Sequence, residues 1–328
     1  MTTFGDGLFQ YGGAPVASGG MLGLIPGKIG QVFFVDWANG SDANPGTASE
    51  PMKTLSTVHS KMTANRNDIA VMSGPHSSAG TGAFRESDTL TWSKNMCHLV
   101  GANTYHRIAH RNSIRATSGA TTFTPLMSVT ASGCVFANFH LFHGFAANSA
   151  QICLAETGER NSYFNVHIGG MGAQLAADNA GSRCITLTGD GERLFKGCTI
   201  GLDTVTRGAA NSSVEFISAA VRDIFEDCLF LANLDAATPT WALASAAGSI
   251  DRWILFNNCI FMNSTEPGGG TAMTDGFNIA AIGGTILLKN CTAVGMTDWE
   301  GTAASGKVMI DGAPPTAATS GLAVDVAT

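Results

Sequence analysis

Four pairs of neighbouring acidic and arginine residues recur along the middle of the chain at intervals of about thirty residues. The pairs are Glu159-Arg160, Glu192-Arg193, Arg222-Asp223 and Asp251-Arg252. Two carboxylates on one face could hydrolyse a glycosidic bond, one as general acid and the other as nucleophile or base. A general acid needs a raised pKa, however, and an adjacent arginine lowers the pKa of a carboxyl group. We therefore interpret the pairs as an exposed ladder of ion pairs, with a polysaccharide-cleaving groove as the alternative.

Histidines and further arginines are the next candidates for chemistry. His140 and His167 are expected to stack and point outward, because they occupy equivalent positions in the repeat described below; no further metal ligands accompany them. The segment YHRIAHRNSIR (105–115) is the one cationic cluster of the sequence. It offers a contact for an acidic partner, with a solvated loop as the alternative. Its spaced arginines are Arg107, Arg111 and Arg115.

Metal and redox chemistry find little support. The eight cysteines include no CxxC pair, which argues against a zinc site or a redox motif. Oxygen-bearing side chains gather in one turn, at Asp36, Asn39, Asp42 and Asn44. This turn lacks a bidentate glutamate, so we favour ordinary turn hydrogen bonds over Ca²⁺ binding. The N-terminal sequence shows no secretory signal, and we predict reduced structural thiols, no metal and no cofactor.

The elements that position these residues form a repeat. One phrase recurs six times, as FANFHL (136–141), YFNVHI (163–168), FKGCTI (195–200), FEDCLF (225–230), FNNCIF (256–261) and LKNCTA (288–293). A second apolar segment precedes each phrase, from LMSVTA (126–131) to FNIAAIGG (277–284), and KVMIDG (307–312) is expected to open a seventh repeat. Apolar segments of four to seven residues fit strands and are too short for helices.

One position in every phrase predicts a sharp bend between two strands. It holds Asn138, Asn165, Gly197, Asp227, Asn258 and Asn290, residue types that tolerate the left-handed αL conformation. The next residue should point inward, which gives a column of Phe139, Val166, Cys198, Cys228, Cys259 and Cys291. A second ladder is expected from Phe136, Phe195, Phe225 and Phe256. Coils of about thirty residues, stacked ~4.8 Å apart, predict an all-β fold, a parallel β-solenoid.

With these repeats and bends, residues 31–312 resemble the right-handed parallel β-helix, or pectate-lyase-like, superfamily. Residues 33–62 resemble the first strand and cap helix of that superfamily, with Pro51 near the helix start and one apolar face of Leu55, Val58 and Met62. A cap helix would cover the open edge of the first coil. The catalytic motifs of the superfamily's enzymes are not found, so no catalytic residue is transferred.

Composition excludes several classes of protein. Charged residues make up 13% of the chain, about half of the usual ~25%, while 45% are hydrophobic, which excludes disorder of the whole chain. The net charge of −7 argues against nucleic-acid binding. No apolar run reaches the ~20 residues of a membrane-spanning helix, so we predict no membrane contact. Low charge suits a solenoid, because like charges on successive coils repel.

The termini differ from the solenoid. Residues 1–30 hold nine glycines and are interpreted as an extended arm, and residues 313–328 as a C-terminal tail. An arm of this kind gains order on a partner surface. Its apolar anchors include Phe4, Leu8, Phe9 and Tyr11.

Together these features resemble a bacteriophage virion structural protein. We expect a noncatalytic capsid decoration or cement protein, made in the host cytoplasm and incorporated in the virion as a homotrimer. Its arm would bind the major capsid protein or another virion protein. The alternative is a tailspike that binds host surface polysaccharide or degrades it as a hydrolase or lyase.

Overall fold

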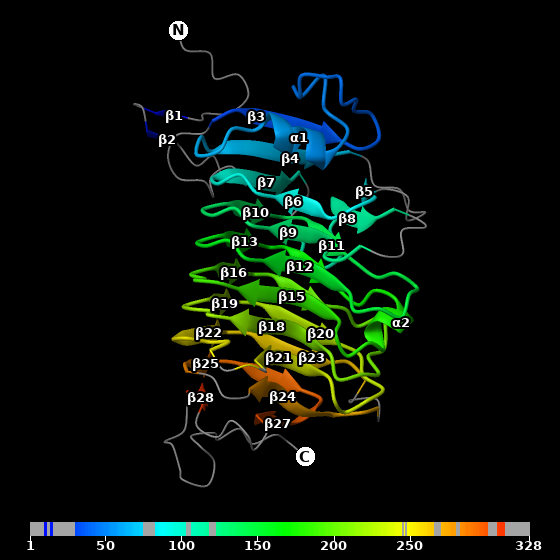
Figure 1. The fold of residues 1–328 in the computed structure, drawn as a ribbon, viewed down its shortest axis with the longest axis vertical. Helices are drawn as coiled ribbons and strands as arrows, with labels where there is room; N and C mark the ends of the chain where they lie inside the picture. The colour runs from blue at the N-terminus through cyan, green and yellow to red at the C-terminus, as the bar shows by residue number, and fades with distance from the viewer. Residues whose placement is uncertain are drawn as a thin grey trace.

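The computed structural model describes residues 30–74, 83–102, 106–117, 123–244, 246, 248–265, 270–279, 283–300 and 307–311, with the backbone of two short strands, β1 (Gln10–Tyr11) and β2 (Ala14–Pro15). The chain winds into an elongated right-handed parallel β-helix of about seven turns (Figure 1). Three parallel sheets run along it, and their strands pair in register with those of the next coil. The predicted fold class is confirmed.

Each regular coil contributes one strand to each sheet, and we name the sheets by their order in the coil. The opening sheet contains β6 (Leu90–Trp92), β9 (Met127–Val129), β12 (Ile152–Glu156), β15 (Arg183–Thr188), β18 (Ser212–Ser218), β21 (Thr240–Ala244), β24 (Met273–Ile279) and β27 (Met296–Glu300). The middle sheet contains β3 (Val32–Asp36), β4 (Asp68–Ser73), β7 (Cys97–Gly101), β10 (Val135–Ala137), β13 (Ser162–Phe164), β16 (Leu194–Lys196), β19 (Ile224–Glu226), β22 (Trp253–Asn257), β25 (Thr285–Lys289) and β28 (Val308–Ile310). The closing sheet contains β5 (Phe84–Glu86), β8 (Ser113–Ala116), β11 (His140–Phe142), β14 (His167–Gly169), β17 (Thr199–Gly201), β20 (Leu229–Ala232), β23 (Ile260–Asn263) and β26 (Thr292–Val294).

The bend between the middle and closing sheets lies at the predicted Asn, Asp or Gly of every phrase. All six residues have a positive φ, from 50° at Asn290 to 63° at Gly197. Their side chains also bond along the stack: Asn165 Nδ2 donates to Asn138 Oδ1 at 2.8 Å, and Asn258 Nδ2 donates to Asp227 Oδ1 at 2.6 Å. These bonds give the side-chain amides of Asn165 and Asn258 an acceptor on the preceding coil.

The residues after the bend point into the interior. Phe139, Val166, Cys198, Cys228 and Cys259 are at most 1% exposed, while Cys291 in the last phrase is partly exposed. Each of the last four thiols donates to a backbone carbonyl of the preceding coil, for example Cys228 Sγ to Phe195 O at 3.2 Å. Beside this column runs an aromatic stack with centroids 4.6–4.8 Å apart. It contains Phe136, Tyr163, Phe195, Phe225 and Phe256, so Tyr163 completes the ladder.

A second column of αL residues marks the corner between the opening and middle sheets. Its members are Asn67, Met96, Gly133, Arg160, Glu192 and Arg222, with φ between 52° and 70°. Only the asparagine and Gly133 are of types that favour αL, whereas Met96, Arg160, Glu192 and Arg222 are not, and the sequence therefore did not predict a bend. The residue after each αL position turns inward, as at Cys134, Asn161 and Arg193.

The cap helix α1 (Leu55–Lys61) covers the N-terminal end of the solenoid, as predicted (Figure 1). Thr54 is its N-cap and accepts from the Thr57 amide at 3.3 Å. Leu55 and Val58 are fully buried and Met62 is 2% exposed. A second, one-turn helix, α2 (Gln174–Ala177), lies in the connection between β14 and β15.

The last coil differs from the sequence prediction. KVMIDG does not open a coil: its strand β28 pairs with β25 in the middle sheet. The opening strand of that coil is β27, which pairs with β24 and has the sequence MTDWE. Two of its five residues are acidic, so the hydrophobic pattern did not reveal a strand there. Within the described residues, no helix is long and apolar enough to cross a membrane.

Candidate functional site

The outer part of the acid–arginine column forms a chain of ion pairs at the second corner. Arg160 Nε lies 2.6 Å from Glu192 Oε2, and the Arg222 guanidinium pairs with the other oxygen of Glu192. The hydrogen bonds from Arg222 and Arg160 lower the pKa of Glu192. Asp251 and Arg252 form an exposed pair at 3.7 Å. A carboxylate held ionised between two arginines is a poor general acid, and we assign these groups to the surface of the solenoid.

Arg193 and Asp223 do not belong to this exposed ladder, and the expectation that they are solvated is wrong. Their side chains are fully buried, with Arg193 Nη1 3.2 Å from Asp223 Oδ2. The reason is the backbone: each residue directly follows an αL residue, Glu192 or Arg222, and the chain after such a bend turns its next side chain inward. The sequence places the acid–arginine pairs at one corner but does not show which member faces the core.

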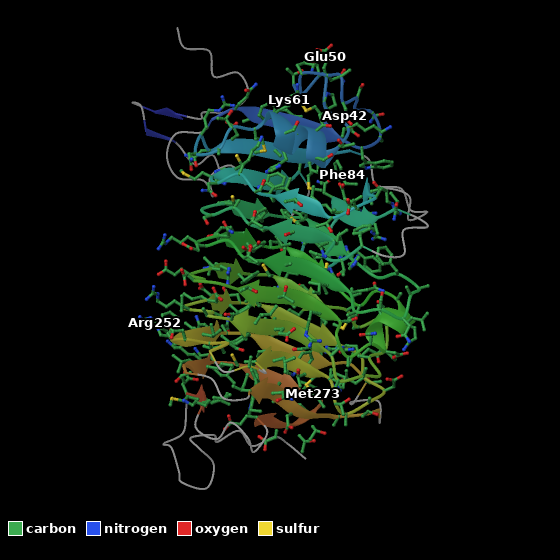
Figure 2. All side chains as sticks on the ribbon, viewed as in Figure 1. Asp42, Glu50, Lys61, Phe84, Arg252 and Met273 are labelled. Carbon is green, nitrogen blue, oxygen red and sulfur yellow. The ribbon has the colours of Figure 1, made fainter. Side chains whose placement is uncertain are left out.

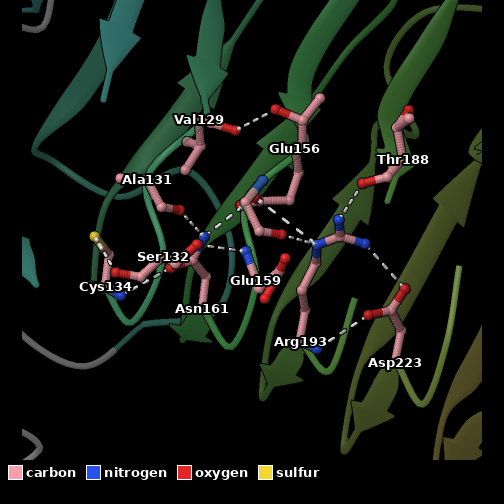
Figure 3. Close-up of polar contacts among 12 residues, drawn as sticks. Val129, Ala131, Ser132, Cys134, Glu156, Glu159, Asn161, Thr188, Arg193 and Asp223 are labelled. Atoms are coloured by element: carbon pink, nitrogen blue, oxygen red, sulfur yellow. Dashed lines mark hydrogen bonds and ion pairs between the residues drawn. The ribbon is translucent and has the colours of Figure 1, made fainter. Parts of the chain in front are cut away.

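Glu156 lies beside this buried pair and extends it into a polar centre (Figure 3). Tyr163 also belongs to this centre. Glu156 accepts hydrogen bonds from Tyr163 OH, from Asn161 Nδ2 at 3.1 Å and from the Gly158 amide at 2.8 Å, and it lies 3.8 Å from Arg193 Nε. Burial raises the pKa of Glu156 to about 7, against the opposing effect of Arg193. Burial also raises the pKa of Asp223. Glu156, Tyr163, Arg193 and Asp223 are all at most 1% exposed, so the centre is closed to solvent.

His140 and His167 stack as predicted, with ring centroids 4.2 Å apart and planes at 4°, but they are not on the surface. Segment 106–112 packs over them, and both residues are at most 2% exposed. The Ala109 amide donates to His167 Nδ1 at 3.0 Å, and His167 Nε2 lies 2.9 Å from Gly201 O, which fits a neutral ring protonated at Nε2. Burial lowers the pKa of His167 to about 4. A segment without repeat character thus covers a face that the periodicity predicts to be exposed.

The three arginines of the cationic segment point to different surroundings. Arg107 donates to the backbone carbonyl of Asp227 at the bend, and Arg115 lies over the Phe142 ring at 4.7 Å from its centroid. Arg111 is exposed. Two of the three guanidinium groups therefore contact other parts of the solenoid. A common patch for an acidic partner stays a hypothesis that rests mainly on Arg111.

Below this covered region, the closing sheet presents an apolar surface to solvent. Ile260 and Met262 on β23 are 42% and 38% exposed, and their register partners Leu229 on β20 and Val294 on β26 are partly exposed. We call these four residues the apolar strip. The strands β20, β23 and β26 contain no Asp, Glu, Lys or Arg.

A pair of aspartates on the opening sheet escaped the sequence analysis. Asp275 on β24 and Asp298 on β27 are register partners on adjacent coils, and their side chains are partly exposed and exposed, respectively. Burial and the charge of Asp298 raise the pKa of Asp275. The signal in the sequence was the repeated tripeptide Met-Thr-Asp, at 273–275 and 296–298.

The oxygen-rich turn uses its polar groups for the backbone. Asp36 Oδ1 accepts from the amides of Ala38 and Asn39 at 2.8 and 3.1 Å, and Asp42 Oδ1 accepts from the amides of Lys53 and Thr54 at 3.0 and 2.9 Å. Among the residues that the structure describes, no three His, Cys, Asp or Glu side chains are grouped to hold a metal ion. The predicted anchors Phe4, Leu8, Phe9 and Tyr11, the arm at 1–29 and the tail at 313–328 lie outside the described side chains.

Comparison with solved structures places the chain in one class of fold, the pectate-lyase-like right-handed parallel β-helix. Pectin methylesterase PemA from Erwinia chrysanthemi is 13% identical, with a TM-score of 0.54 over 83% of this chain and 81% of that one. Pectate lyase Pel9A is 12% identical, with a TM-score of 0.59 over 86% and 68%. ORF18 of Geobacillus virus E2 is 11% identical, with a TM-score of 0.49 over 85% and 59%. Such identities establish the fold alone. No protein-family profile and no curated protein sequence matches the chain.

Proposed function

We propose that this protein is a noncatalytic structural component of a bacteriophage virion, a capsid decoration or cement protein that assembles as a homotrimer. The apolar strip is the observation that carries this proposal. Exposed apolar residues that cluster on one face mark protein–protein contact surfaces, whereas single exposed residues do not. An uncharged strip suits contact between identical chains, because symmetry brings the same face of each copy together without repelling charges.

The chemistry of the corner column supports a noncatalytic role. Glu192 is held ionised by two arginines, and Asp223 is buried against Arg193. Neither carboxylate is suited to protonate a leaving group at the surface. In this proposal the N-terminal arm, with Phe4 and Phe9 among its anchors, attaches the trimer to the major capsid protein.

The copy number and position of the protein in purified particles test this function. A decoration protein should be present in tens to hundreds of copies on the shell. Deletion of residues 1–30 should leave a folded trimer that no longer binds particles. A few copies confined to the tail, or full occupancy by the truncated protein, would contradict the proposed role or its anchor, respectively.

A second function, a tailspike that degrades host polysaccharide, is favoured by the aspartate pair. Asp275 and Asp298 place two carboxylates on adjacent strands of an accessible sheet face, and the raised pKa of Asp275 suits a general acid. Two proteins of similar fold are named as pectin enzymes. A reducing-end assay on host surface polysaccharide separates the two functions. Turnover that Asp275→Asn and Asp298→Asn both abolish would establish the tailspike function.

A further inference from the structure

A cavity of about 440 Å³ opens beside the cap, between the turn that precedes α1 and the first strand of the closing sheet. Its size lies within the roughly 300–1,000 Å³ of typical small-molecule sites. Figure 2 shows one lining residue, Phe84, near the N-terminal end of the solenoid, whereas Met273 lies near the other end. The lining residues are Trp37, Ala38, Lys53, Thr54, Ala83, Phe84, Arg85 and Glu86. We call this cavity the cap pocket.

The cap pocket combines an apolar wall with two cations. The indole of Trp37 is partly exposed and packs against the core, and Phe84 is 2% exposed at the inner end of the wall. Lys53 and Arg85 are exposed and add two cationic side chains to the lining of the pocket. Arg85 Nη1 donates to Ala116 O at 2.9 Å, which holds this guanidinium near the pocket.

Glu86 adds a carboxyl acceptor to the lining of the cap pocket. It lies in the partly buried position at the end of β5, and burial raises its pKa to about 7. Within the described part of the chain, its carboxyl has no hydrogen-bond or ion-pair partner. A partly buried carboxyl group without a protein partner can accept a hydrogen bond from a ligand.

We propose that the cap pocket binds an acidic sugar unit, with the sugar ring against Trp37, its carboxylate toward Lys53 and Arg85, and a hydroxyl donated to Glu86. A sugar ring has an apolar C–H face and a rim of hydroxyls, so it matches an aromatic wall beside a hydrogen-bond acceptor. A simple anion would leave Glu86 unsatisfied, and an amine would be repelled by the two cations. A neutral sugar would use the wall but not the charges.

This site is separate from the surfaces used in the proposed functions. The apolar strip lies on β20, β23 and β26, and the aspartate pair lies on β24 and β27, all in the C-terminal half of the solenoid (Figure 1). The cap pocket is next to α1 at the other end. Binding there can therefore fail or succeed independently of trimer formation and of polysaccharide cleavage.

Three sugars that share one ring test the proposal with the full chain: D-glucuronate, D-glucose and D-glucosamine, titrated at neutral pH and followed by ligand-observed NMR. We expect millimolar binding of glucuronate, about tenfold weaker binding of glucose, and none of glucosamine. Lys53→Gln should weaken glucuronate binding about tenfold, whereas Lys61→Gln, an exposed lysine of α1 outside the pocket, should not. Glu86→Gln should weaken glucuronate and glucose alike, since it acts on a shared hydroxyl.

Several outcomes would overturn the proposal. These are the absence of glucuronate binding, equal binding of all three sugars, a preference for glucosamine, or an equal effect of Lys53→Gln and Lys61→Gln. Trp37→Ala should also abolish binding, but it removes core packing. Lys53→Gln and Glu86→Gln, checked for unchanged thermal unfolding, therefore decide the question.

Discussion

Asp275 and Asp298 are register partners on β24 and β27, each the last residue of a Met-Thr-Asp tripeptide. Parallel strands lie ~4.8 Å apart, so the two carboxylates face solvent one above the other. Like charges in such a position repel, and here the repulsion adds to burial in raising the pKa of Asp275. An unfavourable pair of this kind invites a test of whether it serves function or is merely tolerated.

Asp275→Asn should stabilise the protein at pH 7 by about 0.5 kcal/mol, because it removes the repulsion. The folded-state pKa of Asp275 is raised, so protonation relieves the same repulsion in the wild type as pH falls. The advantage of the variant should therefore disappear in acid. Urea unfolding of the variant and the wild type, at pH 7 and in acid, measures this difference in stability. A variant that is less stable at pH 7 would show that Asp275 makes a favourable interaction instead.

Asp223→Asn and Glu192→Gln form a matched pair at one corner. Asp223→Asn leaves the Arg193 guanidinium buried beside a neutral amide, and loss of a buried ion pair costs about 3–5 kcal/mol. Glu192 lies at the surface, and its pairs with Arg160 and Arg222 contribute less than about 1 kcal/mol. Sequence alone suggests small effects for both; the structure predicts a large one for Asp223. Equal free energies of unfolding for the two variants would contradict the assignment.

The sequence predicted the fold because its signals are local. An Asn or Asp at 138, 165, 227, 258 and 290 sets an αL bend, and the following residue must then point inward. The errors arise where contacts join distant segments. The burial of His140 and His167 depends on how segment 106–112 packs across the closing sheet, and strand periodicity contains no information on this contact. The aspartate pair was missed because its strands are not apolar.

Burial of histidines makes the protein sensitive to acid. Six of the seven histidines in the described part of the chain are buried, and burial lowers the pKa of His143 to about 4. Because the unfolded chain binds protons near pH 6.5, stability should fall as pH decreases from about 6.5 toward 4. Glu86 and Glu156, whose pKa values are raised to about 7, oppose this trend.

His143→Phe isolates one contribution to this acid sensitivity. The ring of His143 packs between Phe123 and Phe145 at 5.8 and 4.8 Å, and neither of its nitrogens has a hydrogen-bond partner in the described residues. The variant should unfold at higher urea than the wild type, and the difference should grow between pH 6.5 and pH 4. A difference that stays constant with pH would mean that His143 does not titrate in this range.

The thiol column predicts an order of reactivity. Cys198, Cys228 and Cys259 are buried, and Cys291 is partly exposed at the C-terminal end. Access decides this order, because the pKa of Cys291 is raised as well as that of Cys228. In native protein, a thiol reagent should modify Cys291 first and the other three at the rate of unfolding. Mass spectrometry of the labelled peptides measures this order. Fast labelling of Cys228 in native protein would show that the column faces solvent and not the interior.

Ile260→Asp tests the role of the apolar strip against Ile217→Asp. Both isoleucines are exposed to nearly the same extent, 42% and 43%, but Ile217 lies on β18 of the opening sheet. Because each side chain is already solvated in the single chain, neither substitution should change monomer stability by more than about 0.5 kcal/mol. In a trimer that buries the strip, Ile260→Asp would place a charge in an apolar contact, one in each copy. Light scattering should therefore show monomers for Ile260→Asp and trimers for Ile217→Asp and the wild type. If Ile260→Asp remains trimeric, the closing sheet is not the contact face, and a monomeric Ile217→Asp would point to the opening sheet instead.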